Sequence, residues 1–431
     1  MKKQYQMEQQ RAVQQFRRIA TEQNPNIQMI LPLADIVGML QQGVGNLLRE
    51  TGLALMQTVM EEEVRQLAGE RHQQHEGRRA HRWGKENGYC VVDGQKVPIQ
   101  KTRLRTKDRR EQRLGSYELF QRSGPLQMGV WDKMMRGLST RNYGAVVKEF
   151  HNAYGVEKSA VSENFIEASR EKVKQLMERP LGELRLCAIV IDGTPFKDRQ
   201  IIAALGIGCD GAKTVLGIRE GATENTAVVS SLLSELVERG VNFSVPRLYI
   251  LDGGKALASA VRKHAGEAGL IQRCQVHKRR NVVDHLPDEY KADVRRKLQN
   301  AYSMAGYAEA KRALDQLHRE LMDLNPSAAR SLEEGMEETL TVHKLRVPDQ
   351  LRRTLCCTNV IESAFSIVET VCRNVKRWRD GDHIERWVGS GLLVAERQFR
   401  KVIGFRQIPL LLSSMANLVS KKSIAKQVAV A

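Results

Sequence analysis

The stretch Leu184-Arg185-Leu186-Cys187-Ala188-Ile189-Val190-Ile191-Asp192-Gly193-Thr194 decides the fold class of this chain. Its short apolar run is rich in β-branched residues and closes on a glycine, which predicts a buried strand with Asp192 where the strand leaves the core. Two more strand-like runs follow at 200–209 and 213–218, and the Asp210-Gly211 pair between them is a strong hairpin signal. Three consecutive strands are therefore expected.

A helix and a fourth strand complete the pattern. Residues 225–239 carry apolar side chains at helical spacing and stop at Gly240. Arg247-Leu248-Tyr249-Ile250-Leu251 then predicts a strand that ends at Asp252. This order indicates an α/β fold, with Asp192 after the first strand and Asp252 after the fourth.

The composition favours a polyanionic partner. The chain has 431 residues, enough for two or three domains, with 68 Lys and Arg against 50 Asp and Glu and a formal net charge of +18. Such a charge suits nucleic acid, although a soluble basic protein without that partner would show the same balance. Seven scattered cysteines, an odd number, fit a reducing cytoplasm rather than a disulfide framework. We find no signal-peptide pattern and no long uncharged apolar run that could span a bilayer.

The residues before about 180 are expected to bind DNA or a second copy of the chain. Residues 1–27 are rich in Gln, Arg and Lys, and we expect a loose or frayed terminus there. Apolar residues recur at intervals of three and four between 30 and 67, which predicts one or two amphipathic helices that serve a dimer contact or the core. A short β segment is expected at 89–97.

Two features of this N-terminal part suit DNA. The stretch Lys101-Thr102-Arg103-Leu104-Arg105-Thr106-Lys107 alternates cations, so Arg103 and Arg105 would face a phosphate backbone or guard an edge strand. A helix from 140 to about 154, a break at Gly155 and a second helix from Ser159 give the helix-turn-helix pattern. Two packed helices without any DNA contact would produce the same pattern.

The two aspartates carry the chemistry. In a ribonuclease H-like sheet the first and fourth strands are neighbours, so Asp192 and Asp252 would face each other at one sheet edge. Two carboxylates that close repel unless cations bridge them, and Mg²⁺, which prefers oxygen ligands, is the natural bridge. Glu362, in Thr358-Asn359-Val360-Ile361-Glu362-Ser363, is the candidate third ligand of a two-metal site for phosphoryl transfer. The alternative is a capping-box or helix-surface glutamate. Phosphatases of the haloacid dehalogenase type are excluded, because they need an aspartate where Val190 stands.

Four motifs, in this order, resemble the Mutator-type transposases of bacterial insertion sequences over about residues 80 to 400. They are Asp192-Gly193-Thr194, Tyr249-Ile250-Leu251-Asp252-Gly253-Gly254, the segment 272–287 with its Cys-x-x-His, and the segment 358–363. The resemblance implies a DDE transposase with a ribonuclease H-like catalytic core and an all-helical insertion. It implies that Asp192, Asp252 and Glu362 bind two Mg²⁺ (or Mn²⁺) ions. Cys357 departs from the family pattern, which often has threonine there, but no ligand changes.

From this resemblance we expect five regions: an N-terminal helical region for dimerisation or DNA binding (1–80), a DNA-binding region with the β segment and the helix-turn-helix (81–180), the first part of the core (181–302), the helical insertion (303–350) and the completion of the core (351–431). The partner would be double-stranded DNA, both the terminal inverted repeats and the target. A homodimer in the bacterial cytoplasm, at the nucleoid, would cleave a strand to leave a 3′-hydroxyl and transfer it into the target. The alternatives are an inactive DNA-binding regulator and a ribonuclease H-like nuclease without strand transfer.

The remaining candidates lie beside the acidic residues. Cys274 and His277 form half of a zinc motif without a second pair, so we expect a structural role, with metal binding or a DNA contact as alternatives. Basic residues nearby would hold phosphates or belong to a solvated helix face. They are Lys278, Arg279, Arg280, Arg373, Lys376 and Arg377.

Overall fold

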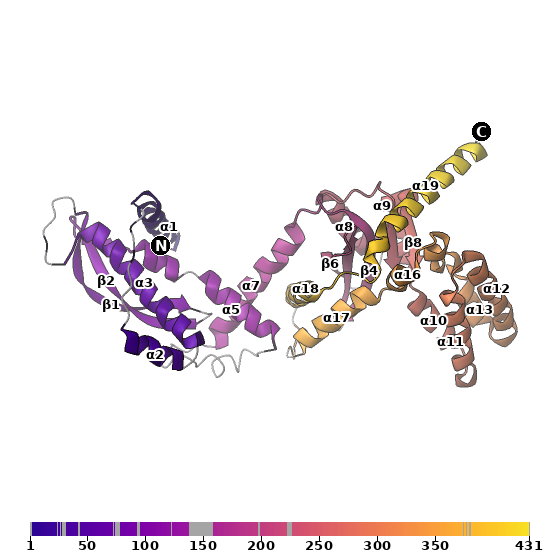
Figure 1. Cartoon of the computed structure of the whole chain (residues 1–431), viewed down its shortest axis with the longest axis horizontal. Helices are drawn as coiled ribbons and strands as arrows, with labels where there is room; N and C mark the ends of the chain where they lie inside the picture. Colours follow the sequence, from indigo (N-terminus) through magenta and orange to yellow (C-terminus); the bar gives the residue numbers. More distant parts are fainter. Residues whose placement is uncertain are drawn as a thin grey trace. The chain divides into compact units, whose positions relative to one another are not determined.

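The computed structural model divides the chain into two compact units, Met1–Ala168 and Ser169–Ala431 (Figure 1). It describes residues 2–23, 25, 27, 32–41, 44–71, 73, 78–92, 95–121, 123–137, 158–196, 199–221, 226–373, 375, 377–378 and 381–430. Helix α7 (Lys158–Glu178) crosses the boundary between the two units.

The first unit combines helices with a small sheet of order β1-β2-β3, in which both pairs are antiparallel. Its elements are α1 (Lys2–Arg18), a π-helix (Ile19–Gln23), α2 (Leu33–Gln41), α3 (Val44–Ala68), β1 (Ala80–Val92), β2 (Gln95–Thr106), β3 (Glu111–Gln112), α4 (Gly115–Phe120) and α5 (Ser123–Met135).

Helix α3 covers the β1–β2 hairpin. Met60, Val64 and Leu67 of the helix are buried with Cys90 and Leu104 of the strands in one apolar cluster. A single core therefore joins residues on both sides of position 80. The expectation of one or two amphipathic helices between 30 and 67 is confirmed by α2 and α3.

Other expectations for this unit need correction. Residues 2–18 form a helix rather than a frayed terminus, and Ala12 and Val13 are buried because α1 packs on α4. Gly115 permits that approach, since an added Cβ there would lie 2.1 Å from the carbonyl oxygen of Ala12. The β segment expected at 89–97 is the turn end of a longer hairpin that pairs Ala80 with Thr106. The helix expected at 140–154 and the break after it lie outside the described residues, whereas α7 confirms a helix near 159.

The second unit is built around a five-stranded sheet of order β6-β5-β4-β7-β8. Its strands are β4 (Leu186–Phe196), β5 (Arg199–Gly208), β6 (Lys213–Gly221), β7 (Arg247–Leu251) and β8 (Gly269–Arg273). β5 is antiparallel to both β4 and β6, whereas β7 is parallel to β4 and to β8. The expected order of three strands, a helix and a fourth strand is confirmed, and the fold is of the α/β class.

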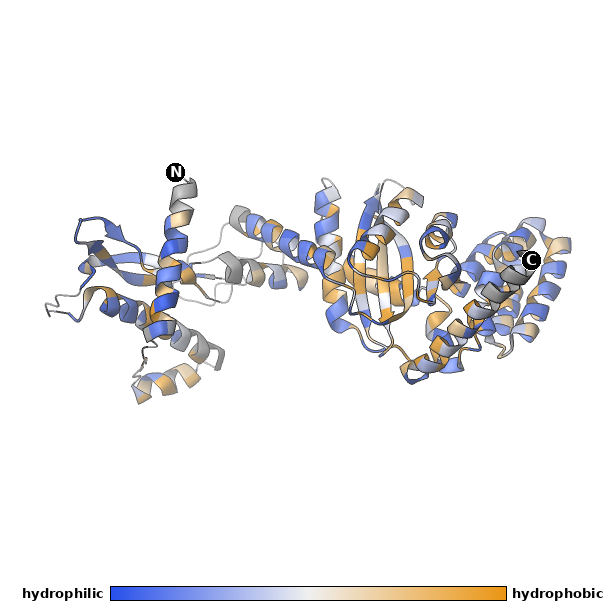
Figure 2. Ribbon diagram, turned by 90° about the horizontal axis from the view of Figure 1, so that it is seen from above, coloured by the Kyte–Doolittle hydropathy of each residue, from blue (hydrophilic) through white to orange (hydrophobic). Residues whose placement is uncertain are grey.

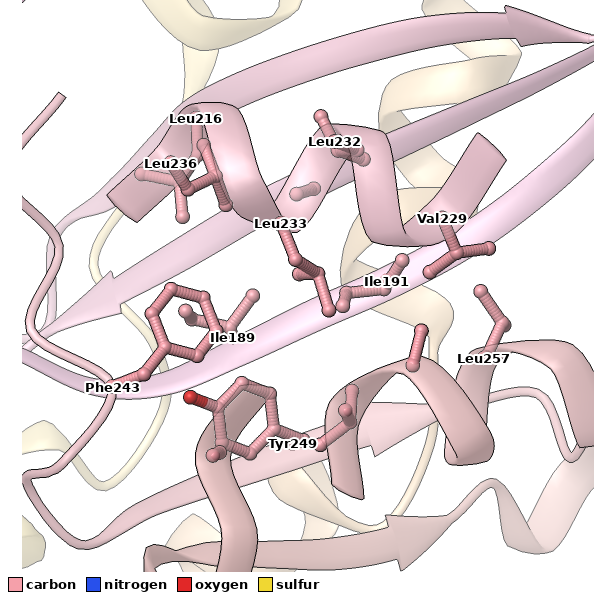
Figure 3. Close-up of a cluster of buried hydrophobic side chains, with 14 of the residues drawn as sticks. Ile189, Ile191, Leu216, Val229, Leu232, Leu233, Leu236, Phe243, Tyr249 and Leu257 are labelled. Carbon is pink, nitrogen blue, oxygen red and sulfur yellow. The ribbon is translucent and has the colours of Figure 1, made fainter. Parts of the chain in front are cut away.

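Helices α8 (Thr226–Glu238) and α9 (Lys255–Ala265) pack on one face of this sheet. Figure 3 shows Leu233 of α8 beside Ile191 of β4, and both are fully buried. Figure 2 shows these strands mostly in the hydrophobic colour. Burying a side chain of this size contributes about 1.5 to 3 kcal/mol, so the strand that carries Asp192 is anchored in the core.

Helices fill the rest of the second unit. They are α10 (Gln275–Asp284), α11 (Asp288–Ser303), α12 (Tyr307–Leu324), α13 (Pro326–Glu333), α14 (Met336–Thr339), α15 (Thr341–Lys344), α16 (Asp349–Leu355), α17 (Asn359–Cys372), α18 (Gly381–Gln398) and α19 (Ile408–Val430), with short 3₁₀ turns at Gly266–Ala268 and Phe405–Gln407. The segment from Val282 to Leu340 has an apolar cluster of its own. The expected helical stretch after β8 is confirmed.

Helices α16 and α17 are two separate helices. The chain turns between them, where the carbonyl oxygen of Cys356 accepts a hydrogen bond from the N–H of Gln275, 2.9 Å away. The turn lets α17 start afresh at Thr358 and lie against β4. Within the described residues no single helix is long and apolar enough to cross a membrane, and only α16 and α17 taken together, bent by 50°, meet that test.

Candidate active site

Asp192 and Asp252 lie on neighbouring parallel strands. The pairing of β4 with β7 ends at Ile191↔Leu251, and the aspartates are the next residues of each chain segment. Adjacent strands are about 4.8 Å apart. Ile191 and Leu251 both face the core under α8 and α9, so side-chain alternation puts both aspartates on the opposite face. The two acidic residues therefore share one face at the point where β7 stops.

The expectation that Asp192 ends its own strand is wrong. β4 continues to Phe196, and Asp192 pairs with Ala203 of β5. It is the neighbouring strand β7 that stops, and this leaves Asp192 open on the side of Asp252.

Backbone N–H groups hold one oxygen of each aspartate. The N–H of Gly193 donates to Oδ1 of Asp192 at 3.0 Å, and the N–H of Gly254 donates to Oδ1 of Asp252 at 2.8 Å. Gly253 makes this second contact possible, since its φ of +115° suits only glycine and an added Cβ would lie 2.3 Å from Nε of Arg273. The Asp-Gly-Gly turn thus fixes the carboxylate of Asp252 beside Asp192.

The surroundings of the two aspartates disfavour a negative charge on Asp192. Asp192 is only 4% exposed. Burial, and next the charge of Asp252, raise the pKa of Asp192 to about 7, while the charge of Glu362 adds to the rise and His277 opposes it. Among the described residues no lysine or arginine pairs with either aspartate. Carboxylate oxygens in this state suit a hard divalent cation, which would offset both the burial and the repulsion.

Glu362 approaches from helix α17, close enough for its charge to act on Asp192. Thr358 sits at the N-cap position of this helix, but its side chain does not cap the backbone. Instead Oγ1 of Thr358 donates to Oε1 of Glu362 at 2.7 Å. Glu362 therefore does not form a capping box, because its carboxylate accepts a hydrogen bond from the side chain of Thr358.

Cys274 joins three elements of the site. Its N–H donates to the carbonyl oxygen of Leu251 at 2.7 Å, directly before Asp252. Its fully buried sulfur caps α10 by accepting from the N–H of His277 at 3.5 Å, and accepts from the N–H of Thr358 at 3.4 Å. The end of β7 and the starts of α10 and α17 therefore meet at one thiol.

His277 lies between this thiol and the carboxylates. Its Nδ1 is 3.9 Å from Oε1 of Glu362 and 3.3 Å from Oγ1 of Thr358. Hydrogen bonding to Cys274 raises the pKa of His277 to about 9, against the opposing effect of burial, and the charges of Asp192 and Glu362 add to the rise. Cys274, His277 and Glu362 offer ligand atoms within 4.8 Å of one another. Asp192 and Asp252 are not part of that group of three. We call Asp192, Asp252 and Glu362, with His277 beside them, the acidic centre.

A family model described as "Transposase, Mutator family" matches residues 26–401. The chain belongs to this family. The resemblance drawn from the four motifs is therefore confirmed. Members of a transposase family cleave and recombine DNA, and they generally use divalent metal ions, which agrees with the acidic centre described above.

Curated transposases of insertion sequences are similar to this chain. The transposase of ISRM5 from Rhizobium meliloti (strain 1021) is 27% identical over 327 residues, which cover 73% of this chain and 79% of that protein. The transposase of IST2 from Acidithiobacillus ferrooxidans is 28% identical, covering 54% of this chain and 72% of its own. The transposase of IS256 in transposon Tn4001 from Staphylococcus aureus is 25% identical, covering 67% and 76%.

The basic residues expected to touch DNA beside the acidic centre differ in exposure. Lys278 is fully buried, and its Nζ donates to the carbonyl oxygens of Ser331 and Glu334 at 2.5 Å each. This corrects the expectation of a phosphate contact, because α13 packs over the lysine and takes its hydrogen bonds. Arg280 is exposed, and Arg279 is half-buried with a hydrogen bond to Gln299.

Other predicted DNA contacts are open to solvent or lie elsewhere. Arg373 at the end of α17 and Arg377 after it are exposed, and Lys376 lies outside the described residues. In the first unit Arg103 is within ion-pair distance of Glu86 and Glu111, at 4.0 and 3.8 Å.

Arg105 lies with its guanidinium carbon 4.1 Å from the centre of the Trp83 ring. Trp83 was not predicted as a functional residue, because it belongs to none of the sequence motifs. The contact of the Thr358 hydroxyl with Glu362 was not predicted either, although the spacing of four residues puts both on one helix face and could have indicated it.

Proposed function

We propose that this chain is a DDE transposase that binds the terminal inverted repeats of an insertion sequence. It cleaves a DNA strand in a divalent-metal-dependent reaction that leaves a 3′-hydroxyl, and it transfers that end into target DNA. The observation that carries the proposal is the pair Asp192 and Asp252 on adjacent strands, with the charge of Glu362 reaching Asp192.

The sheet supports a ribonuclease H-like core. Three antiparallel strands are followed by a helix and two parallel strands on the far side of the first, in the order β6-β5-β4-β7-β8. Helices α12 to α15 would be the insertion, and α12 to α14 share an apolar cluster with α10 and α11. On this proposal the core comprises about residues 181–302 and 351–431, the insertion about 303–350, and the regions 1–80 and 81–180 bind DNA and a second copy.

The donor set fits Mg²⁺ or Mn²⁺. Asp192, Asp252 and Glu362 would hold two ions, which supply Lewis-acid activation of water and of the phosphodiester when bound. Thr358 keeps the carboxylate of Glu362 oriented, and the backbone N–H groups after each aspartate leave the second oxygen of each carboxylate for a cation. His277 balances part of the negative charge at the centre. Cys274 and His277 would thus support the site rather than form one of their own.

The test uses a duplex that carries the terminal inverted repeat of the element, a supercoiled target plasmid and Mg²⁺. The wild-type protein should produce strands with a 3′-hydroxyl and joined products, and Asp192→Asn should abolish both while it still binds the duplex. Asp323→Asn, an exposed aspartate of α12, is the matched control and should stay active. Full activity in Asp192→Asn would refute the proposal, binding without cleavage under every divalent metal would favour a regulator, and cleavage without joining would favour a nuclease.

Because an insertion sequence has two ends, we also propose that two copies act together, in the compartment that holds the nucleoid. Light scattering of the protein with and without its terminal repeat should give the mass of a homodimer in the complex; a complex with a single copy would contradict this.

A further inference from the structure

Trp83 is a large aromatic side chain on the surface of the first unit. It is 57% exposed, whereas two of the other three tryptophans, Trp131 and Trp387, are buried and Trp378 is half-buried against Phe196. The position is built by a β-bulge, because the register of β1 with β2 shifts between Arg82 and Gly84 and leaves Trp83 as the extra residue. Gly84, with φ of +120°, supplies the backbone angle that the bulge needs.

One face of the indole ring is already occupied. Arg105 of β2 stacks on it at 4.1 Å. An arginine in this position holds the ring in one orientation and adds positive charge beside it. What remains open is the other face of the ring, which suits a flat, electron-rich group.

A cationic turn follows Arg105 at the end of β2. Lys107, Arg109 and Arg110 are exposed there, with Asp108 as the acidic residue of the turn. The turn is closed by the N–H of Thr106 donating to the carbonyl oxygen of Arg110, 2.9 Å away. Arg109 has φ of +60°, a left-handed conformation that is uncommon for a residue other than glycine.

Among the described residues, the cations of the turn and Arg105 have no ion-pair partner. Over the described ranges, the ion pairs of the β1–β2 hairpin involve Arg82, Lys101 and Arg103, and none involves Arg105 or the three cations of the turn. A partner for this surface must therefore bring negative charge as well as a flat ring. A protein hot spot would use Trp and Arg too, but the excess of positive charge favours nucleic acid.

We propose that Trp83, Arg105, Lys107, Arg109 and Arg110, here called the bulge–turn element, bind DNA that carries an unpaired base. The open face of Trp83 stacks on the base, and the turn holds the adjoining phosphates. Inside an intact duplex each base face is covered by its neighbours and only base edges are open in the grooves, so an aromatic side chain that stacks through its ring face favours unpaired bases. The inference rests on the proposed function, because cleavage of a strand produces the DNA ends at which a base can be unpaired.

The experiment measures binding by fluorescence anisotropy in EDTA, so that no cleavage occurs. The probes are a fluorescein-labelled 20-base-pair blunt duplex and the same duplex with a 3′ overhang of four thymidines. The wild-type protein should bind the overhang about tenfold more tightly, as expected for the stacking of one base. Trp83→Ala should remove this preference and leave blunt-duplex binding unchanged, whereas Trp83→Phe should keep most of it.

Two controls make the result specific. Tyr290→Ala removes an aromatic side chain of α11 that is 39% exposed, and should keep the full preference. Quenching of tryptophan fluorescence by acrylamide provides a second measurement, which does not depend on the folding of Trp83→Ala. The overhang probe should protect the wild-type protein from acrylamide, and this protection should be lost in Trp83→Phe.

The inference is overturned by equal affinity of the wild-type protein for both probes, or by a preference that survives Trp83→Ala. It is also overturned if Trp83→Ala weakens both probes equally, which would indicate a groove contact, or if it alters only the oligomeric state, which would indicate a protein interface. In each of these cases the cleavage activity that depends on Asp192 can still be present, and the proposed function then stands. Failure of the wild-type protein to bind either probe would count against both proposals.

Discussion

The acidic centre and the bulge–turn element handle charge in opposite ways. Asp192 is 4% exposed on a strand whose apolar neighbours are fully buried, while Trp83 is 57% exposed and the cations beside it face solvent. The packing of α8 and α17 on the sheet holds the acidic side chains in place. In the bulge–turn element the side chains are positioned by the backbone conformation, through a β-bulge at Trp83 and the positive φ of Arg109.

This difference separates chemistry from binding. The buried carboxylate of Asp192 remains costly until a cation joins it, so on the proposed function the acidic centre would be completed by ions and not by the DNA. Exposed cations gain little from one another and most from a polyanion, so the bulge–turn element would be completed by DNA. Substitutions in the first region should stop the reaction and spare binding, and those in the second should weaken binding and spare the reaction.

Glu362→Gln should have the largest effect. Loss of one carboxylate from a set of three that acts as a unit should lower strand cleavage on the order of 1,000-fold or more. The dissociation constant for DNA in EDTA should stay within a factor of two of the wild-type value, which corresponds to about 0.4 kcal/mol of binding free energy. Gel assays of cleavage at saturating DNA, with anisotropy for binding, measure the two effects.

Glu369→Gln is the matched control, because this glutamate is exposed on the same helix and should be dispensable. A Glu362→Gln protein that cleaves normally would remove Glu362 from the centre. Equal losses of cleavage and of binding would instead show that the two regions are not separable.

Thr358→Val comes next, and tests the orientation of Glu362. Valine keeps the shape of threonine but removes the hydroxyl that donates to Oε1 at 2.7 Å. Loss of such a supporting hydrogen bond costs about 10- to 100-fold in metal affinity or activity. Titration of cleavage with Mg²⁺ should show a higher half-saturating concentration, with Thr358→Ser close to wild type. Thr370→Val, on the exposed face of the same helix, should leave the titration unchanged; an identical curve for Thr358→Val would assign the hydroxyl no role at the centre.

Features of these regions that depend on residues close together in the chain could be predicted from the sequence. Features that depend on residues far apart in the chain could not. Asp192 and Asp252 follow from local strand patterns, and their order in the chain implies neighbouring strands. The face that each side chain occupies follows from the alternation within β4, which buries Ile191 and leaves Asp192 opposite. These features were predictable because they depend on backbone periodicity and on a short list of sheet orders.

Features that depend on how separate helices pack were not predictable. Lys278 reads as an exposed cation in a basic segment, and only the packing of α13 reveals that it is buried. The exposed position of Trp83 depends on a register shift of one residue, which no local pattern signals. The contact of Cys274 with Thr358 joins residues 84 positions apart.

Removing the cations of the turn should have a smaller, purely electrostatic effect. The triple variant Lys107→Ala, Arg109→Ala and Arg110→Ala should lower affinity for a 20-base-pair duplex about tenfold at 0.15 M salt. The slope of log K against log salt should become shallower by about 2 to 3 units, since each lost phosphate contact accounts for about 0.9. Cleavage at saturating DNA should not change.

The matched control removes three exposed cations from helices α11 to α13, by changing Arg295, Arg319 and Arg330 to Ala. It has the same net charge as the triple variant. An equal change of slope in both proteins would mean that overall charge, and not the turn, determines binding.

Lys278→Met should have the smallest effect on DNA, because this lysine belongs to the buried region despite its charge. The salt slope should not change, whereas a phosphate contact would predict a loss of about 0.9 units. The substitution should instead change how the free energy of unfolding depends on pH. Burial lowers the pKa of Lys278 to about 8, below its ordinary value of 10.5. Between these values the unfolded chain holds a proton that the folded protein has released, so the contribution of this lysine to stability rises with pH.

The free energy of unfolding should be measured in urea at pH 7.0 and pH 9.5 for both proteins. The value for the wild type, relative to that for Lys278→Met, should increase by about 2 kcal/mol from the lower to the higher pH, since each pKa unit corresponds to about 1.4 kcal/mol. At both pH values the variant also lacks the hydrogen bonds to Ser331 and Glu334, a constant difference that the comparison cancels. A difference independent of pH, together with a shallower salt slope, would place Lys278 with the DNA-binding cations. It would then erase the distinction between a buried region that positions acids and an exposed region that binds phosphates.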